Sequence, residues 1–359
     1  MKTKISKKSL AIGLAAVAGA LLVSCSEQST SNVPVLTLDH TAKDTTNMLI
    51  AEDINFNIPI SALNIYVYED SIAVVCNKRS EWFLELYNLN ENRLIKSFLR
   101  YGNGPGEMLD ANFYFSKDTI TVEDFQKDRL AVIPLHDAVH NDSYNPELRT
   151  HSVQSQYKLP FKGRLVALNP YCFINREYGI NNDGPRFILT DSNYVYKASS
   201  RYKYDTYNVS YSLFFISHIN DRIVFVNTHE PTLEIYDLKF NLLKKIIGPE
   251  MPGTQKYQIE DDGQVIFLNS IPAAYTSFCY DESCFYVSYN GALLSYKNNF
   301  DRSLLKTWIM KFDWDGNFID SYYIDYYIES MSLSKDSRYI YVFGTDSNGE
   351  NVFYKYLLK

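Results

Sequence analysis

The sequence has few of the residues that usually carry catalysis or bind metals. Its 359 residues include only five Cys and six His, and no Cys-x-x-Cys or Cys/His spacing typical of zinc sites occurs. It also lacks a Gly-x-Ser-x-Gly elbow, a His-Glu-x-x-His motif and an EF-hand loop. These absences exclude the enzyme classes that a local motif identifies. We therefore assign no catalytic residue, cofactor-binding residue or metal ligand.

Clusters of basic residues are missing as well. The chain has 35 Lys and Arg against 42 Asp and Glu, a formal net charge of −7. Four lysines are the only charges in residues 1–24, so the chain without that segment has a net charge of −11. Binding to nucleic acid or to anionic lipid needs clustered Lys and Arg. The charge balance therefore excludes nucleic acid as a partner and argues against direct adsorption to an anionic membrane surface.

Only one long apolar run occurs, and it lies near the N-terminus. Residues 10–23 carry no charge and follow a segment with four lysines. The run is too short for a comfortable membrane span, and a basic segment followed by a short apolar one is typical of a signal peptide. The run ends in Leu22-Val23-Ser24-Cys25, with a small residue directly before Cys and an aliphatic residue three positions before it.

This ending resembles the lipobox of bacterial lipoproteins. The resemblance implies that residues 1–24 are a cleaved signal peptide and that Cys25 becomes the lipidated first residue of the mature chain. The two or three acyl chains of such a residue hold a protein stably on a bilayer. The alternative is an ordinary secretory signal with an incidental Cys.

The segment after Cys25 fits an anchored protein. Residues 26–32 contain no hydrophobic side chain, so we expect residues 25–34 to form the lipidated Cys and a flexible tether. Ser26, rather than Asp, follows the Cys, which is similar to signals for sorting to the outer membrane. We therefore predict a protein of the cell envelope, bound through lipid on Cys25 to the outer membrane, on its periplasmic or surface side.

A turn between two alternating apolar stretches recurs along the rest of the chain. Each turn has an acid or Asn near its centre, and the steps between these markers are 48, 51, 52, 61 and 54 residues. The markers are Asp70, Asp118, Asn169, Asp221, Glu282 and Asp336. Apolar residues at every second position predict strands, and a period near fifty is typical of four-stranded propeller blades. A two-sheet sandwich is the structural alternative.

The last repeat ends after three strands. A fourth strand from the N-terminus, around residues 35–38 or 54–60, would close the ring and leave no open sheet edge. We therefore predict an all-β fold over residues 35–359: a six-bladed β-propeller of four-stranded blades, closed by an N-terminal strand that joins the C-terminal blade.

One sequence motif resembles that of a known family. Tyr101-Gly102-Asn103-Gly104-Pro105-Gly106-Glu107 resembles a phrase of TolB-like six-bladed propeller lipoproteins of Gram-negative bacteria. Gly allows positive φ and Pro fixes φ, so Gly102, Gly104, Pro105, Gly106 and Glu107 are predicted to form a structural turn. The resemblance implies fold and location and no particular chemistry.

Two functions from different classes fit these features. The first is a binding module that presents one face to a glycan, a peptide or a partner protein of the envelope; thirty Tyr and twenty-one Phe are consistent with it, although aromatic residues also favour strands. The second is a calcium-dependent hydrolase or lactonase that uses the propeller channel. Ligands of such a site come from different blades and leave no local motif. A calcium-titrated thermal melt separates the two.

Loop lengths predict which face binds. In a propeller, the links from second to third strand and from blade to blade lie on one face, and the longest predicted links are of these two kinds. Long loops on a rigid scaffold usually carry binding. Contact is predicted near the following residues of that face: Arg79, Arg176, His229, Tyr289 and Asn290.

Second strands tend to end in Asn, as at Asn77, Asn227 and Asn290. The amide has two donors and an acceptor and could line a channel mouth. Alternatively, Asn ends strands by bonding nearby backbone.

Cys279 and Cys284 would face each other across a two-residue turn at positions 281 and 282, which allows a disulfide; two buried thiols are the alternative.

Overall fold

The computed structural model describes the backbone of residues 33–43, 49–78, 80–116, 118–124, 126–127, 129–150, 163–169, 172–177, 187–191, 196–199, 212–217, 221–228, 230–249, 257–259, 265–267, 270–295, 301 and 305–358. Side chains are described for most of these residues, but not for those between 150 and 220 or between 250 and 269. Pro34–Lys359 forms one compact unit.

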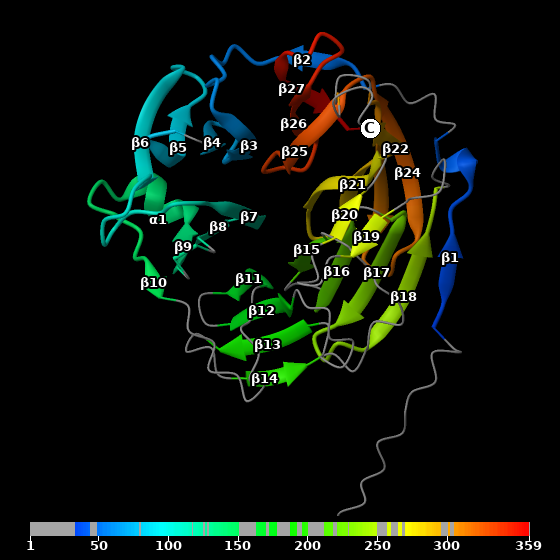
Figure 1. Cartoon of the computed structure of the whole chain (residues 1–359). Coiled ribbons are helices and arrows are strands. Elements are labelled where there is room, and N and C mark those ends of the chain that lie inside the picture. Colours follow the sequence, from blue (N-terminus) through cyan, green and yellow to red (C-terminus); the bar gives the residue numbers. More distant parts are fainter. Residues whose placement is uncertain are drawn as a thin grey trace, which may run out of the picture. The chain divides into compact units, whose positions relative to one another are not determined.

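Within the described residues, six sheets surround a common centre, and the four strands that make up each blade are antiparallel to their neighbours (Figure 1). Blade 1 contains β3 (Ala62–Tyr68), β4 (Ile72–Asn77), β5 (Trp82–Asn88) and β6 (Arg93–Arg100). Blade 2 contains β7 (Asn112–Ser116), β8 (Thr119–Asp124), β9 (Arg129–Pro134) and β10 (Arg149–Thr150). Blade 3 contains β11 (Gly163–Asn169), β12 (Cys172–Glu177), β13 (Phe187–Asp191) and β14 (Tyr196–Ser199).

The second half of the ring repeats the pattern. Blade 4 contains β15 (Ser212–Ser217), β16 (Arg222–Asn227), β17 (Thr232–Asp237) and β18 (Leu242–Ile247). Blade 5 contains β21 (Ser270–Tyr280), β22 (Cys284–Ser295), β23 (Thr307–Asp313) and β24 (Phe318–Ile324). Blade 6 contains β25 (Tyr327–Leu333), β26 (Tyr339–Thr345), β27 (Asn351–Leu357) and β2 (Ala51–Asp53). The predicted six-bladed propeller is confirmed, and the sandwich is excluded.

Five short elements lie outside this pattern. The helix α1 (Leu135–His140) follows β9, and the 3-10 helix η2 (His40–Lys43) follows β1 (Val35–Thr37). The strands β19 (Tyr257–Ile259) and β20 (Val265–Phe267) form a two-stranded ribbon. No helix in the described part of the chain has the length and apolar character needed to cross a membrane.

An N-terminal strand closes the ring, as predicted, but its position differs from both predicted segments. β2 pairs antiparallel with β27, with Ala51 opposite Tyr356. Its three residues are all exposed, so the strand has no apolar alternation for a sequence pattern to detect. Residues 35–37 instead form β1, which adds a parallel fifth strand to β18 of blade 4.

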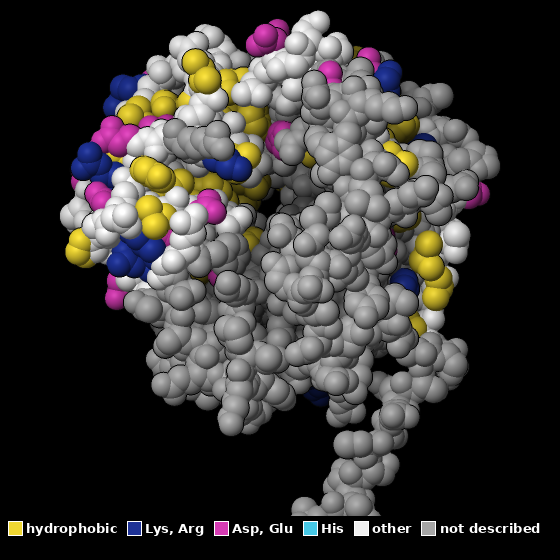
Figure 2. Space-filling model, viewed as in Figure 1, with side chains coloured by type: hydrophobic (Ala, Val, Ile, Leu, Met, Phe, Trp, Pro, Cys, Tyr) yellow, Lys and Arg dark blue, Asp and Glu magenta, His cyan; other side chains and the backbone are white. Residues whose placement is uncertain are grey.

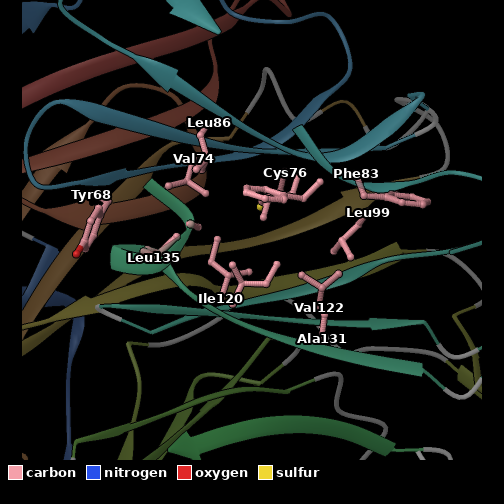
Figure 3. Close-up of a cluster of buried hydrophobic side chains, with 14 of the residues drawn as sticks. Tyr68, Val74, Cys76, Phe83, Leu86, Leu99, Ile120, Val122, Ala131 and Leu135 are labelled. Carbon is pink, nitrogen blue, oxygen red and sulfur yellow. The ribbon is translucent and has the colours of Figure 1, made fainter. Parts of the chain in front are cut away.

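Neighbouring blades pack face to face through alternate side chains of their strands. Between blades 1 and 2, Val74 and Cys76 of β4 lie against Ile120 and Val122 of β8 (Figure 3). All four are fully buried, and each pair is two positions apart, because successive side chains of a strand point to opposite faces. Buried clusters of this kind lie between blades 1 and 2, 4 and 5, 5 and 6, and 6 and 1, which are the gaps whose side chains the structure describes on both sides.

The N-terminal strap, which we define as residues 34–43 and 49–56, runs along three of these gaps. Leu38 packs in the cluster shared by blades 4 and 5, and the amide of Leu38 donates to the carbonyl of Ile247 at 2.7 Å. Leu49 packs between blades 5 and 6, and Phe56 between blades 6 and 1. The indole of Trp308 donates to the carbonyl of Lys43 at 3.0 Å. The strap therefore fastens successive blades from outside.

The hairpin of blade 5 shows whether Cys279 and Cys284 face each other. Cys279 lies opposite Tyr286, and the amide of Asp281 donates to the carbonyl of Cys284 at 2.9 Å. The expected turn at positions 281 and 282 is therefore wrong, because Asp281 rather than Cys279 faces Cys284. Both are buried free thiols, and burial raises the pKa of each.

Candidate functional site

The inner hairpins of four blades surround a cavity of about 630 Å³, which we call the mouth cavity. The first strand of each blade is the one nearest the centre, so the turns between first and second strands meet around the propeller axis at one end (Figure 1). The space-filling view shows an opening at the centre of the ring on the side drawn there (Figure 2). The lining residues are Val67 to Glu69 of blade 1, Phe115 and Asp118 of blade 2, Phe278 to Ser283 of blade 5 and Ser332 to Ser337 of blade 6.

Aromatic side chains form part of this lining and are held in place by their neighbours. The ring of Phe115 stacks on Tyr66 with a centroid distance of 4.2 Å. The ring of Tyr280 meets Trp314 edge-on at 5.7 Å. The hydroxyls of Tyr280 and Ser116 lie 2.9 Å apart in a hydrogen bond. Because blades 2 and 5 are opposite members of a six-bladed ring, this bond spans the channel and fixes the distance between its walls.

Carboxylates dominate the charge of the mouth cavity. Five acids line it, against the single lysine Lys335, among the residues that the structure describes there. The acids are Glu69, Asp118, Asp281, Glu282 and Asp336. Burial together with Glu69 and Asp118 raises the pKa of Tyr68 to about 12, as expected where negative charges gather.

Two of these acids are held in the ionised form by hydrogen bonds. Burial acts to raise the pKa of Asp281, but the hydroxyl of Ser283 and the amides of Ser283 and Cys284 donate to its carboxylate and lower that pKa overall. Donation from Ser334 and Arg338 lowers the pKa of Asp336 to about 2. Both groups are therefore charged at neutral pH.

The structure brings together only part of the predicted ligand face. Arg79 and His229 lie outside the described residues, and for Arg176, in β12, only the backbone is described. Tyr289 is 0% exposed and donates from its hydroxyl to the carbonyl of Pro249 at 2.6 Å. Asn290 is 3% exposed. Ligand contact at this face stays a prediction, because most of its long links fall outside the described residues.

The strand-ending Asn residues have structural partners. Asn77 donates to the carbonyl of Trp82 at 3.1 Å and to the carboxylate of Glu85 at 2.8 Å. Asn290 donates to the carbonyl of Lys306 at 2.9 Å and to the hydroxyl of Thr307 at 2.8 Å. Each amide thus ties its strand to the next strand of the blade, which is closer to the strand-ending alternative than to a channel-lining role.

The Gly-Asn-Gly-Pro-Gly-Glu phrase forms the link from β6 to β7. The amide of Gly104 donates to the carboxylate of Glu107 at 2.6 Å, and an added Cβ at Gly102 would lie 2.2 Å from that carboxylate. From blade 2, Lys127 donates to the carbonyl of Glu107 at 3.0 Å and Arg129 to that of Pro105 at 2.8 Å. In this loop a backbone amide therefore binds the carboxylate of Glu107, and two basic side chains of blade 2 anchor the loop.

This loop gives a stability prediction. Glu107→Ala should lower the free energy of unfolding by about 1–3 kcal/mol, because the Gly104 amide loses its acceptor in a half-buried place. Urea denaturation measures the loss. Glu107→Gln keeps an oxygen acceptor and should lose less, and the exposed Glu91→Ala serves as the control, with a change below about 0.5 kcal/mol. Equal effects of Glu107→Ala and Glu91→Ala would contradict the role assigned to Glu107.

The calcium hypothesis finds no ligand set in the described residues. No three Asp, Glu, His or Cys side chains of that part of the chain gather in an arrangement that could hold a metal ion. The calcium-dependent activity stays an untested prediction.

Sequence reasoning missed the mouth cavity, although its signal was present. The repeat pattern identifies Asp118, Glu282 and Asp336 as turn residues. Because they recur at the same place in different blades of a ring, they also lie around one axis.

Comparison with known proteins agrees with this architecture. A family model described as TolB-like 6-blade propeller-like matches residues 42–336. Among solved structures, a member of the DUF4221 family from Bacteroides vulgatus superimposes with a TM-score of 0.55 at 10% identity, over 88% of this chain and 99% of that one. A Bacteroides fragilis protein predicted to be exported gives 0.52 at 11% identity, over 90% of this chain and 100% of that one. No curated protein sequence matches the chain. Identities this low indicate a shared fold alone.

Proposed function

This chain belongs to the TolB-like six-bladed propeller family, and from that premise we propose that it is a lipid-anchored binding module of the cell envelope. Its mouth cavity, at the opposite end of the propeller from the face that loop lengths predict, is the binding site, and its ligand is a glycan, a peptide or a partner protein. The observation that carries the proposal is the cavity itself, about 630 Å³ in volume and bounded by turns of four blades. Pockets of this size usually bind small molecules or single segments of a larger partner.

The construction of the walls supports a binding role. The lining residues belong to hairpins whose strands pack into the cores between blades, and the Tyr280–Ser116 bond fixes two opposite walls. A site built on such elements loses little conformational freedom when a ligand enters, which favours affinity. A cavity of this kind can select ligands without any catalytic group.

The anchor is proposed from the N-terminal sequence. Leu22-Val23-Ser24-Cys25 resembles a lipobox, and the polar residues 26–32 fit a tether. A lipid on Cys25 would hold the propeller at a membrane, where a binding module meets envelope components. The predicted export of the Bacteroides fragilis protein with the same fold agrees with this proposal.

A blocked mouth tests the binding role. We expect the purified mature chain to bind members of an array of peptides and oligosaccharides, and Lys335→Trp to weaken that binding by about tenfold, because the bulky, rigid indole narrows the mouth cavity. Arg93→Trp is the matched control, since Arg93 is also an exposed cation but lies at the start of the outer strand β6. An array without binders, or binding that Lys335→Trp leaves unchanged, would contradict the proposal.

A further inference from the structure

We infer that the mouth cavity binds a basic peptide segment and receives one of its Lys or Arg side chains. This inference rests on the proposed function, because it names the class of ligand for the same cavity. The cavity defines where the ligand binds, and the side chains that line it indicate the chemical class of that ligand.

The first argument is the arrangement of charge. Each of the four blades that line the cavity contributes at least one carboxylate: Glu69 from blade 1, Asp118 from blade 2, Asp281 and Glu282 from blade 5 and Asp336 from blade 6. Acids on opposite sides of one cavity surround a ligand in its centre, and low-dielectric walls focus their field there. A cation at the centre is attracted by all of these carboxylates at the same time. An anionic glycan would be repelled from every described side.

The basic groups near the rim of the mouth cavity are too few to balance its carboxylates. Arg338 engages Asp336, and His140 lies 3.5 Å from Glu69. Lys335 is the one basic residue among the described lining, so acids outnumber bases five to one there. Asp118, directly before β8, is exposed, and its charge adds to burial in raising the pKa values of Tyr68 and Tyr280.

The second argument is the aromatic part of the lining. Tyr68, Phe115, Phe278 and Tyr280 line the same cavity as the acids. Aromatic rings attract a desolvated ammonium or guanidinium group through their π faces, and they also cover the apolar stem of a Lys or Arg side chain. Acids and rings together therefore match both ends of such a side chain. A neutral sugar would use the rings but would gain nothing from the charge.

The volume supports a peptide rather than a small cation. A metal ion or a simple amine would leave most of about 630 Å³ unfilled, whereas a basic side chain with its flanking backbone fills a cavity of this class. The hydroxyls of Ser283 and Ser337 at the rim donate to Asp281, and their oxygens can accept hydrogen bonds from the N–H groups of a peptide backbone.

Four probes test the ligand class: acetylated and amidated Gly-Lys-Gly-Lys-Gly, the same peptide with norleucine for lysine, the same peptide with glutamate, and chitotriose. Calorimetric titration of the purified lipoprotein in detergent should show binding of the lysine peptide, about tenfold weaker binding of the norleucine peptide and none of the glutamate peptide. Raising the salt from 50 to 300 mM should weaken binding of the lysine peptide, because salt screens exposed charges.

Matched variants test whether the carboxylates of the mouth cavity are responsible for peptide binding. Asp118→Asn with Glu282→Gln should weaken binding of the lysine peptide by about tenfold, whereas Glu91→Gln with Glu147→Gln removes the same charge away from the cavity and should leave it unchanged. Unaltered urea midpoints show that all variants fold. Equal binding of lysine and norleucine peptides, or binding that the first double variant leaves unchanged, overturns the inference. Chitotriose binding that Lys335→Trp abolishes, without peptide binding, also overturns it but supports the proposed function. Binding of none of the four overturns both.

Discussion

The Leu49→Ala variant should lose about 2–5 kcal/mol of unfolding free energy, one of the largest effects expected of a single substitution here. Leu49 is 8% exposed and packs among side chains of blades 5 and 6, including Tyr286, Ile309 and Tyr356. Truncation to Ala leaves a cavity between two blades that strand pairing prevents from collapsing. Ile50→Ala is a closely matched control, because Ile50 is the next residue and is 82% exposed. It should change the free energy by less than about 0.5 kcal/mol.

Combining the three anchors of the N-terminal strap should have a still larger effect. Leu38, Leu49 and Phe56 fill three successive gaps between blades. Three losses of about 2–5 kcal/mol approach the total stability of about 5–15 kcal/mol of a typical domain, so the triple Ala variant should fail to fold at 37 °C. Urea denaturation followed by tryptophan fluorescence measures the single variant, and circular dichroism the triple. A triple variant as stable as Ile50→Ala would show that the strap fastens nothing.

Replacement of Cys25 by Ala should abolish membrane attachment. If the thiol of Cys25 carries the diacylglyceryl group, its removal leaves no site for lipid, and an unlipidated lipobox precursor is not cleaved. Without acyl chains in the bilayer, the acidic mature chain has no other proposed means of membrane binding. Metabolic labelling with palmitate, followed by electrophoresis, should show loss of label and accumulation of a larger precursor.

Ser26→Ala provides the control for the anchor. It changes the neighbouring residue and keeps Leu22-Val23-Ser24-Cys25 intact, so labelling and processing should be unchanged. A Cys25→Ala variant that still incorporates palmitate would contradict the lipobox interpretation. A variant that is cleaved and released without ever having been labelled would support the ordinary secretory signal instead.

The sequence by itself determined the blades. Apolar runs, such as Ile72 to Val75 or Ile340 to Phe343, and the turn residues between them are local signals, because a strand with another blade packed on each face is apolar at successive positions. The repeat length then set the number of blades, and the unfinished last repeat required closure by an N-terminal strand. That strand, Ala51–Asp53, escaped localisation because all its residues are exposed and its sequence carries no apolar pattern.

Only the tertiary structure decided the register and the site. A shift of one residue in the turn placed Asp281, and not Cys279, opposite Cys284, since hairpin register follows the hydrogen bonds of the turn. The burial of Tyr289 follows from its packing between blades 4 and 5, which no local pattern reveals. The mouth cavity joins residues as far apart as Glu69 and Asp336, and they become neighbours only because closure of the ring brings the first and last blades together.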